Sequence, residues 1–271
     1  MKCGTNTLGH LIAAHPDIVL KRAQPLDQGG FGIKTGMTNA EGTVMFEIHH
    51  FTHATLNGRY NGKNIPVDPL SREAREYYAR ILPEHSNGWT IDKSPSYLDV
   101  HFEIFENVPN TMHQMLPNAK IVFTVCDPVG RLYSHWEHLM NRVPNNPLVQ
   151  QFTLEQAIEA ALDTSNITCS LCLQARHQML EIGFYAPHIK KWKDVYGEES
   201  VMVVEMEKLS DPETTRNVLK FLELDQTKYP WDAVDFSKRH YALHPSGASE
   251  RLAPQWMHDA LDDVYAPYAV I

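Results

Sequence analysis

The first residues of the chain carry side chains that could bind an anion. The sequence begins MKCGTNTLGHLIAAHPDI, in which Lys2 precedes a glycine and two threonines. Leu8, Leu11 and Ile12 then recur at helical spacing, so we expect a helix over residues 6–15. Glycine permits close approach of an anion, and the N–H groups and dipole of a helix N-terminus favour negative charge. The segment is therefore a candidate phosphate loop, although threonine and asparagine also begin ordinary helices.

Missing motifs and the overall charge argue against several classes of protein. The pattern G-x-x-x-x-G-K-[ST] is absent, which disfavours a nucleotide triphosphatase or kinase of that type. The net charge of −9 disfavours nonspecific binding of nucleic acid. Hydrophobic residues make up 43% of the 271 residues, enough for a buried core. We find no apolar run long enough to span a membrane and no signal peptide.

Helical and strand patterns alternate along the sequence, which predicts an α/β fold with a central parallel sheet flanked by helices. We expect buried strands at 119–125 and 200–207, a short strand or turn at 43–51, and a glycine-rich loop over 21–43. Helices are expected at 71–82, 127–143, 154–164, 186–197, 211–224 and 254–271. Asp-Pro begins two of these helices and Gly197 ends another. No linker divides the chain, so we expect a single domain over residues 1–271.

Six segments together resemble the sulfotransferases that use 3′-phosphoadenosine 5′-phosphosulfate (PAPS), most of all the heparan sulfate type. The opening loop resembles that family's 5′-phosphosulfate loop, and FEIHHF resembles its Glu-x-His-Phe-Phe stretch. DKSPSYL resembles its Lys-[Ser/Thr]-Pro-x-Tyr stretch, and IVFTVCDPVGRLYSHWEH its 3′-phosphate strand and helix. The family's Gly-x-Tyr helix, with the strand and Asp-Pro helix after it, is resembled by IGFYAPHIKKW and the residues that follow. Its glycine loop over the nucleotide falls at HPSGASERLAP, and all six segments agree with the family in order and spacing.

The resemblance implies a P-loop-like three-layer domain and transfer of a sulfuryl group from PAPS, without a metal. In such a fold a central strand precedes the phosphate loop, so we expect a first strand upstream of residue 1. An anchor or targeting segment upstream would fit the Golgi lumen or secretory pathway.

The resemblance also implies which residues contact PAPS. The loop residue Lys2 would hold the 5′-phosphosulfate, and Ser134 would hold the 3′-phosphate. The implied donor-binding set is Lys2, Cys3, Gly4, Thr5, Asn6, Thr7, Cys126, Ser134, Gly247, Ser249 and Arg251.

Four residues would serve the transfer itself: Glu47, Lys2, His49 and Lys93. Glu47 matches the family's catalytic base, and its apolar neighbours would raise its pKa toward the working pH. Without the resemblance, a surface glutamate at a strand end is the simpler interpretation. His49 would orient the acceptor and Lys93 would contact the sulfate or an acidic acceptor. His49 and His53 have metal-ligand spacing on a helix, but no third ligand accompanies them.

Two departures from the family pattern weaken the expected 3′-phosphate site. Cys126 stands where the family has an arginine, and a thiol cannot replace bidentate hydrogen bonds. The closing loop around Gly247 keeps Arg251 as its only nearby basic residue. We interpret Arg131 as a structural ion pair rather than a ligand. A noncatalytic nucleotide- or glycan-binding relative is therefore the alternative to an enzyme.

The remaining features concern compartment and acceptor. Cys169 and Cys172 form a lone C-x-x-C, for which two small apolar side chains on one helix face is the favoured interpretation and a disulfide the next. Asn166 begins a glycosylation sequon, a triplet that also occurs often by chance; if used, it would make the chain a glycoprotein of the secretory pathway. The acidic balance favours a neutral sugar or small alcohol over an acidic glycan as the acceptor, and a carbohydrate hydroxyl or amine fits the family.

Overall fold

The computed structural model describes residues 3–19, 33–38, 44–47, 51, 68, 70–81, 89–98, 108–165, 169–238 and 253–268. The strands are β1 (Ile18–Val19), β2 (Ile33–Thr38), β3 (Val44–Glu47), β4 (Trp89–Thr90), β5 (Ile121–Val125) and β6 (Val201–Glu205). The helices are α1 (Thr5–Ala13), α3 (Arg72–Ile81), α4 (Val108–Met115), α5 (Pro128–Arg142), α6 (Pro147–Gln151), α7 (Leu154–Leu162), α8 (Ser170–Ala175), α9 (Tyr185–Tyr196), α10 (Pro212–Phe221) and α11 (Gln255–Tyr265).

Parallel strand pairs form the framework, as the sequence predicts for an α/β fold. β5 pairs with β6 in parallel, with Ile121 opposite Val201 and Val125 opposite Glu205. β1 pairs with β4 in parallel, and β2 pairs with β3 antiparallel. α1 contacts both β1 and β5 and so lies between the two parallel pairs. The expected strand upstream of residue 1 stays a prediction.

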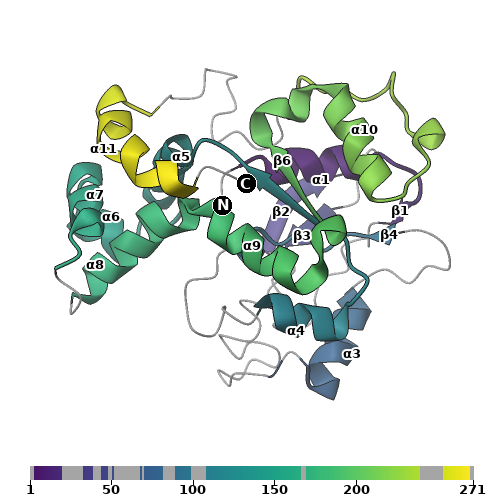
Figure 1. Cartoon of the computed structure of the whole chain (residues 1–271), viewed down its shortest axis with the longest axis horizontal. Coiled ribbons are helices and arrows are strands. Elements are labelled where there is room, and N and C mark those ends of the chain that lie inside the picture. Colours follow the sequence, from purple (N-terminus) through teal and green to yellow (C-terminus); the bar gives the residue numbers. More distant parts are fainter. Residues whose placement is uncertain are drawn as a thin grey trace.

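The pair β5–β6 is covered by helices on both faces, which explains its nearly continuous apolar sequence. Side chains alternate across each strand. Phe123 and Val201 face α4 and α9, whereas Val122 and Val204 face α1 and α10. Figure 1 shows β6 between α1 and α10 on one side and α9 on the other. The result is three layers, helix, sheet and helix, with the carboxyl ends of β5 and β6 at one edge.

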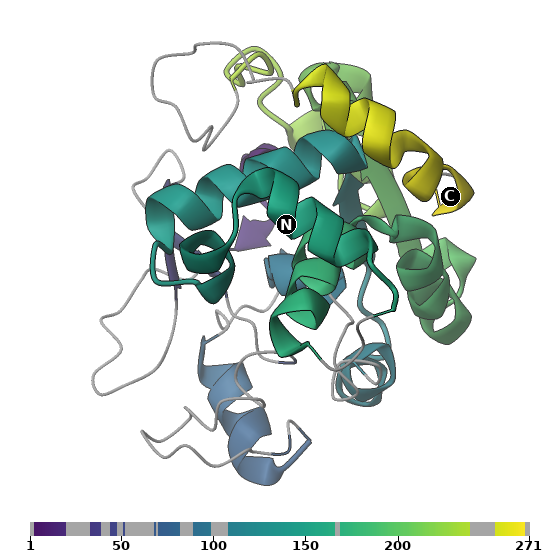
Figure 2. The ribbon, with the colours of Figure 1, turned by 90° about the vertical axis from the view of Figure 1, so that its left-hand side faces the viewer.

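A second core lies beside these layers and consists of helices alone. Leu132 on α5, Ile158 on α7, Ala175 on α8 and Leu261 on α11 belong to one buried cluster. These helices group at one end of the molecule in Figure 1 and face the viewer in Figure 2. The cluster fixes α5, whose N-terminus points toward the end of β5.

Local sequence signals explain where the helices begin and end. Asp127 accepts hydrogen bonds from the N–H groups of Val129 and Gly130 at the start of α5, and Asp211 accepts one at the start of α10. Gly197 ends α9 with a φ of 83°. These predicted signals are confirmed.

The prediction of a loop over residues 21–43 is wrong where β2 forms. The segment IKTGMT pairs with β3 across a register shift between Lys34 and Met37. Its glycine accompanies that irregularity rather than a loop. Within the described part of the chain, no helix combines the length and the apolar character needed to cross a bilayer.

Candidate donor site at the start of helix α1

The candidate phosphate loop has the backbone geometry that an anion site needs. Gly4 is the N-cap of α1 and adopts a φ of 72°, the left-handed region that glycine favours. A Cβ at this position would lie 2.8 Å from Met206 Cγ and 2.9 Å from Leu209 Cδ1. The backbone N–H groups of Thr5 and Asn6 have no acceptor among the described residues. The loop therefore presents free donors at the positive end of a helix dipole.

A buried lysine contacts this loop from another segment. Lys93 is only 4% exposed, and its Nζ donates a hydrogen bond of 2.5 Å to Asn6 Oδ1. The neighbouring Asp92 carboxylate accepts hydrogen bonds from the hydroxyls of Tyr78 and Tyr97 at 2.9 and 2.7 Å. These bonds fix the backbone next to Lys93. The structure thus brings together two predicted site residues, Asn6 and Lys93, that are far apart in the sequence.

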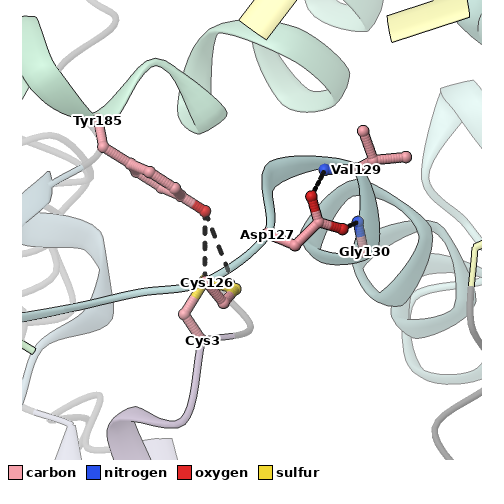
Figure 3. The surroundings of a disulfide bond; sticks show 6 residues. All are labelled: Cys3, Cys126, Asp127, Val129, Gly130 and Tyr185. Carbon is pink, nitrogen blue, oxygen red and sulfur yellow. Dashed lines mark hydrogen bonds between the residues drawn. A yellow bond between two sulfur atoms is a disulfide. The ribbon is translucent and has the colours of Figure 1, made fainter. Parts of the chain in front are cut away.

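A disulfide ties the phosphate loop to the end of β5. Cys3 and Cys126 are bonded, with their Cα atoms 5.2 Å apart. The Tyr185 hydroxyl at the start of α9 lies 3.3 Å from Cys3 Sγ and 3.9 Å from Cys126 Sγ, as Figure 3 shows. Burial raises the pKa of Tyr185, and the Arg131 charge opposes this shift only in part. The hydroxyl therefore keeps its proton and donates toward the sulfurs.

Cys126 does stand where the family pattern has an arginine, but the interpretation that it carries a free thiol is wrong. Its sulfur is committed to Cys3, which no local signal indicates because the two residues are 123 positions apart. The predicted contacts of Cys3 and Cys126 with the donor stay predictions. A cystine offers no charge-assisted hydrogen bond to a phosphate.

Helix α5 carries the other residues predicted near the 3′-phosphate. Ser134 is half-buried on α5, and its hydroxyl has no hydrogen-bond partner among the described residues. Arg131 is 1% exposed and donates from Nη2 to the Met179 carbonyl at 2.7 Å. Arg131 is structural as expected, but the predicted ion pair is not found among the described residues, where Arg131 contacts backbone carbonyls and the Tyr265 hydroxyl.

A pocket of about 220 Å³ opens beside the disulfide at the carboxyl edge of β5 and β6. Its lining includes Cys126, Asp127, Tyr185, Glu205, Glu207 and Tyr265. Glu205 also forms an ion pair of 2.7 Å with Lys208. The lining joins three carboxylates with tyrosines, so this pocket has an acidic character rather than the basic one that a phosphate would favour.

Several predicted site residues lie outside the described residues or only partly within them. Glu47 is the last residue of β3 and pairs with Ile33, which places its backbone but not its side chain. The residues outside the described part are Lys2, His49, His53, Gly247, Ser249 and Arg251. Among the residues that the structure does describe, no group of three or more potential metal ligands comes together.

The favoured interpretation of Cys169 and Cys172 is wrong. The two residues form a disulfide at the start of α8, where Cys169 is the N-cap. In a C-x-x-C segment, helical spacing alone cannot distinguish two reduced cysteines on one helix face from a disulfide between them. The sequon at Asn166 lies outside the described residues.

Sequence reasoning also missed Tyr185 as a residue of this site. The only signal was its place in the segment IGFYAPHIKKW, which carried no assigned role.

Comparisons with known proteins agree with this architecture. A bacterial sulfotransferase from Alicyclobacillus acidocaldarius has the same fold, with a TM-score of 0.58 and 20% identity over 98% of this chain and 88% of that one. Bifunctional heparan sulfate N-deacetylase/N-sulfotransferase 1 from Homo sapiens is 24% identical over 83% of this chain. Bifunctional heparan sulfate N-deacetylase/N-sulfotransferase 2 from Homo sapiens is 28% identical over 57% of this chain. The chain spans about a fifth of the length of these curated relatives, 21% and 17%.

The family model described as the sulfotransferase domain matches residues 1–238. That range contains the phosphate loop, Lys93, the end of β5 and helix α5, which form the candidate site. The chain therefore belongs to the sulfotransferase domain family.

Proposed function

We propose that this protein transfers the sulfuryl group of PAPS to a hydroxyl or amine of a carbohydrate or small-molecule acceptor. The observation that carries the proposal is the loop at the start of α1, with Gly4 in the left-handed region and N–H groups on Thr5 and Asn6 that have no acceptor among the described residues. Lys93 adds a buried cation against Asn6. Free backbone donors with an adjacent cation suit the phosphosulfate end of the donor.

The donor's two ends fit the described residues unequally. The 5′-phosphosulfate end suits the loop, because Gly4 takes the left-handed conformation there and the close packing of Met206 and Leu209 leaves no room for a Cβ at this position. The 3′-phosphate end finds only the Ser134 hydroxyl among the residues predicted for it and described here. Arg131 is already bound to backbone carbonyls. We propose that Arg251 of the closing loop supplies the missing positive charge.

The transfer needs an in-line arrangement and a group that takes the acceptor's proton. An acceptor oxygen or nitrogen forms a new bond to sulfur, and the bond between sulfur and the bridging phosphate oxygen breaks. We assign the proton to the Glu47 carboxylate. Lys2 and Lys93 would stabilise the charge that develops on the bridging oxygen, and His49 would orient the acceptor.

The class of acceptor follows from the relatives and from charge. The curated relatives are named for heparan sulfate N-sulfation, which favours a carbohydrate. The chain has 24 Lys and Arg against 33 Asp and Glu, which favours a neutral sugar over a highly acidic polymer. We therefore propose a carbohydrate of low charge.

Both disulfides bear on the compartment. Cystines persist in oxidising environments and are rare in reducing ones. The pairs Cys3–Cys126 and Cys169–Cys172 thus favour the lumen of the secretory pathway, in line with a Golgi location.

A second candidate is a noncatalytic protein that binds a nucleotide or glycan. It is favoured by one observation, the cystine and carboxylates around the pocket where the family pattern has an arginine.

One experiment separates the two candidates. The chain is incubated with donor labelled in its sulfuryl group and with a panel of neutral and acidic oligosaccharides and small alcohols. Transfer of label that depends on acceptor supports the enzyme. Tight binding of adenosine 3′,5′-bisphosphate without transfer to any acceptor in the panel supports the noncatalytic alternative.

A further inference from the structure

We propose that the Cys3–Cys126 disulfide is a reversible redox site, opened by low-molecular-weight thiols, whose reduction weakens donor binding at the phosphate loop. The inference rests on the proposed function, because it concerns the same loop. It adds a modification site and a form of control to that function.

The position of the bond couples it to the loop. Cys3 directly precedes Gly4, the N-cap of α1, and Cys126 directly follows β5. The bond joins positions 123 residues apart and so fixes the start of the loop on the end of the strand. Gly4 is held in a left-handed conformation next to this anchor. Loss of the bond would free the residue whose backbone shapes the anion site.

The two sulfurs differ in access. Cys3 is fully buried, with 0% exposed, whereas Cys126 is 9% exposed and lines the pocket of about 220 Å³. A small thiol that enters the pocket therefore meets Cys126. A protein reductant is too large for a space of this volume.

The surroundings of Cys3 suit the leaving sulfur. The Tyr185 hydroxyl is closer to Cys3 Sγ, at 3.3 Å, than to Cys126 Sγ, at 3.9 Å. Cys3 also lies at the N-terminus of the nine-residue helix α1, where the dipole stabilises a thiolate. A leaving thiol that is stabilised as the thiolate departs faster in thiol–disulfide exchange.

The reaction balances in two exchange steps. A thiolate attacks Cys126 Sγ, forms a mixed disulfide and displaces Cys3 as a thiolate, which the dipole of α1 stabilises. A second thiolate attacks the mixed disulfide, releases Cys126 as a thiol and leaves the small thiol oxidised as its own disulfide. Two electrons pass from two small thiols to the cystine.

Reduction has two consequences for the donor, and both act in the same direction. The loop loses its anchor on β5, so the free energy of donor binding becomes less favourable by the cost of ordering the loop. A thiolate at Cys3 also places negative charge beside the N–H groups that would bind an anion. The oxidised form is therefore the one that binds the donor.

The test measures the affinity of adenosine 3′,5′-bisphosphate by calorimetry before and after reduction with glutathione. A Cys169→Ser, Cys172→Ser background leaves Cys3–Cys126 as the only disulfide. We expect the affinity to fall by about tenfold or more on reduction, which corresponds to ~1.4 kcal/mol. A Cys3→Ser, Cys126→Ser variant should bind weakly in both conditions.

The outcomes distinguish the two ideas. Equal affinity in the oxidised and reduced forms would overturn the redox site and leave the proposed function intact. No binding in either form would overturn the proposed function, and the redox control with it.

A second measurement tests the order of attack. Brief reaction with glutathione, followed by alkylation and peptide mapping, should find glutathione on Cys126 and the alkyl group on Cys3. Tyr185→Phe should slow the reduction, whereas the control Tyr196→Phe, which removes a hydroxyl bonded to the Leu116 carbonyl, should not. Glutathione on Cys3, or equal rates in both tyrosine variants, would contradict the proposed order.

Discussion

At the scale of single residues, we propose that Glu47 takes the acceptor's proton and that the loop at the start of α1 binds most of the donor's negative charge. Glu47 ends β3, so its backbone has a fixed place. Its role follows from the family resemblance and stays a prediction, as do those of Lys2 and His49.

Replacing Glu47 with glutamine should lower turnover by about 10²–10⁴-fold, the usual effect of losing a general base. Binding of adenosine 3′,5′-bisphosphate should change little, because the carboxylate would face the acceptor. Steady-state transfer and calorimetry measure the two effects. Glu198→Gln is a matched control, since this glutamate is exposed and pairs with Lys193. Turnover near that of the control would remove Glu47 from the mechanism.

The Cys126 position tests the 3′-phosphate site. Cys126→Arg introduces a cation but also breaks the disulfide with Cys3, so Cys126→Ser is the necessary control. Compared with the serine variant, the arginine variant should bind adenosine 3′,5′-bisphosphate roughly tenfold more tightly, which corresponds to ~1.4 kcal/mol. Its affinity for adenosine 5′-monophosphate should not change. Calorimetry with both nucleotides gives the comparison. An equal gain for the two nucleotides would show that the added charge does not reach a 3′-phosphate.

At the scale of elements, two helices begin with the same Asp-Pro device. Asp127 caps α5 and Asp211 caps α10, each through hydrogen bonds to backbone N–H groups. Asp127→Ala and Asp211→Ala should each lower the free energy of unfolding by about 1 kcal/mol, the typical value of an N-cap. Denaturant titration measures both. Because Asp127 lies in the acidic pocket beside Cys126 and Asp211 does not, loss of the Asp127 charge should raise nucleotide affinity, whereas Asp211→Ala should leave it unchanged. Equal effects on affinity would place the donor elsewhere.

The sequence predicts the elements well where signals are local. The apolar run of β5, the caps of α5 and α10, and Gly197 after α9 depend on neighbouring residues, and each is confirmed. β2 was missed because its pairing with β3 outweighs the glycine in its sequence. The contact between Asn6 and Lys93 was not predicted, because no local signal links residues 87 positions apart.

At the scale of the whole molecule, the two disulfides constrain the chain very differently. Cys3–Cys126 closes a segment of 123 residues, whereas Cys169–Cys172 spans three. Long-range pairing of this kind depends on the assembled sheet, which explains why sequence spacing did not reveal it.

Replacing Cys3 and Cys126 with serine should therefore cost more stability than replacing Cys169 and Cys172. The entropy of loop closure predicts a loss of about 4–5 kcal/mol for the long loop and below about 3 kcal/mol for the short one. Denaturant unfolding of the two double variants measures both losses. A larger loss for the Cys169–Cys172 pair would contradict this account of the loop's anchor.

We propose that the loop at the start of α1 holds the phosphosulfate end of the donor. A crystal structure with adenosine 3′,5′-bisphosphate would show where the 5′-phosphate binds. We expect the 5′-phosphate within hydrogen-bond distance of the Thr5 and Asn6 N–H groups and beside Lys93 Nζ, with the Cys3–Cys126 bond intact. A 5′-phosphate bound away from this loop would contradict it.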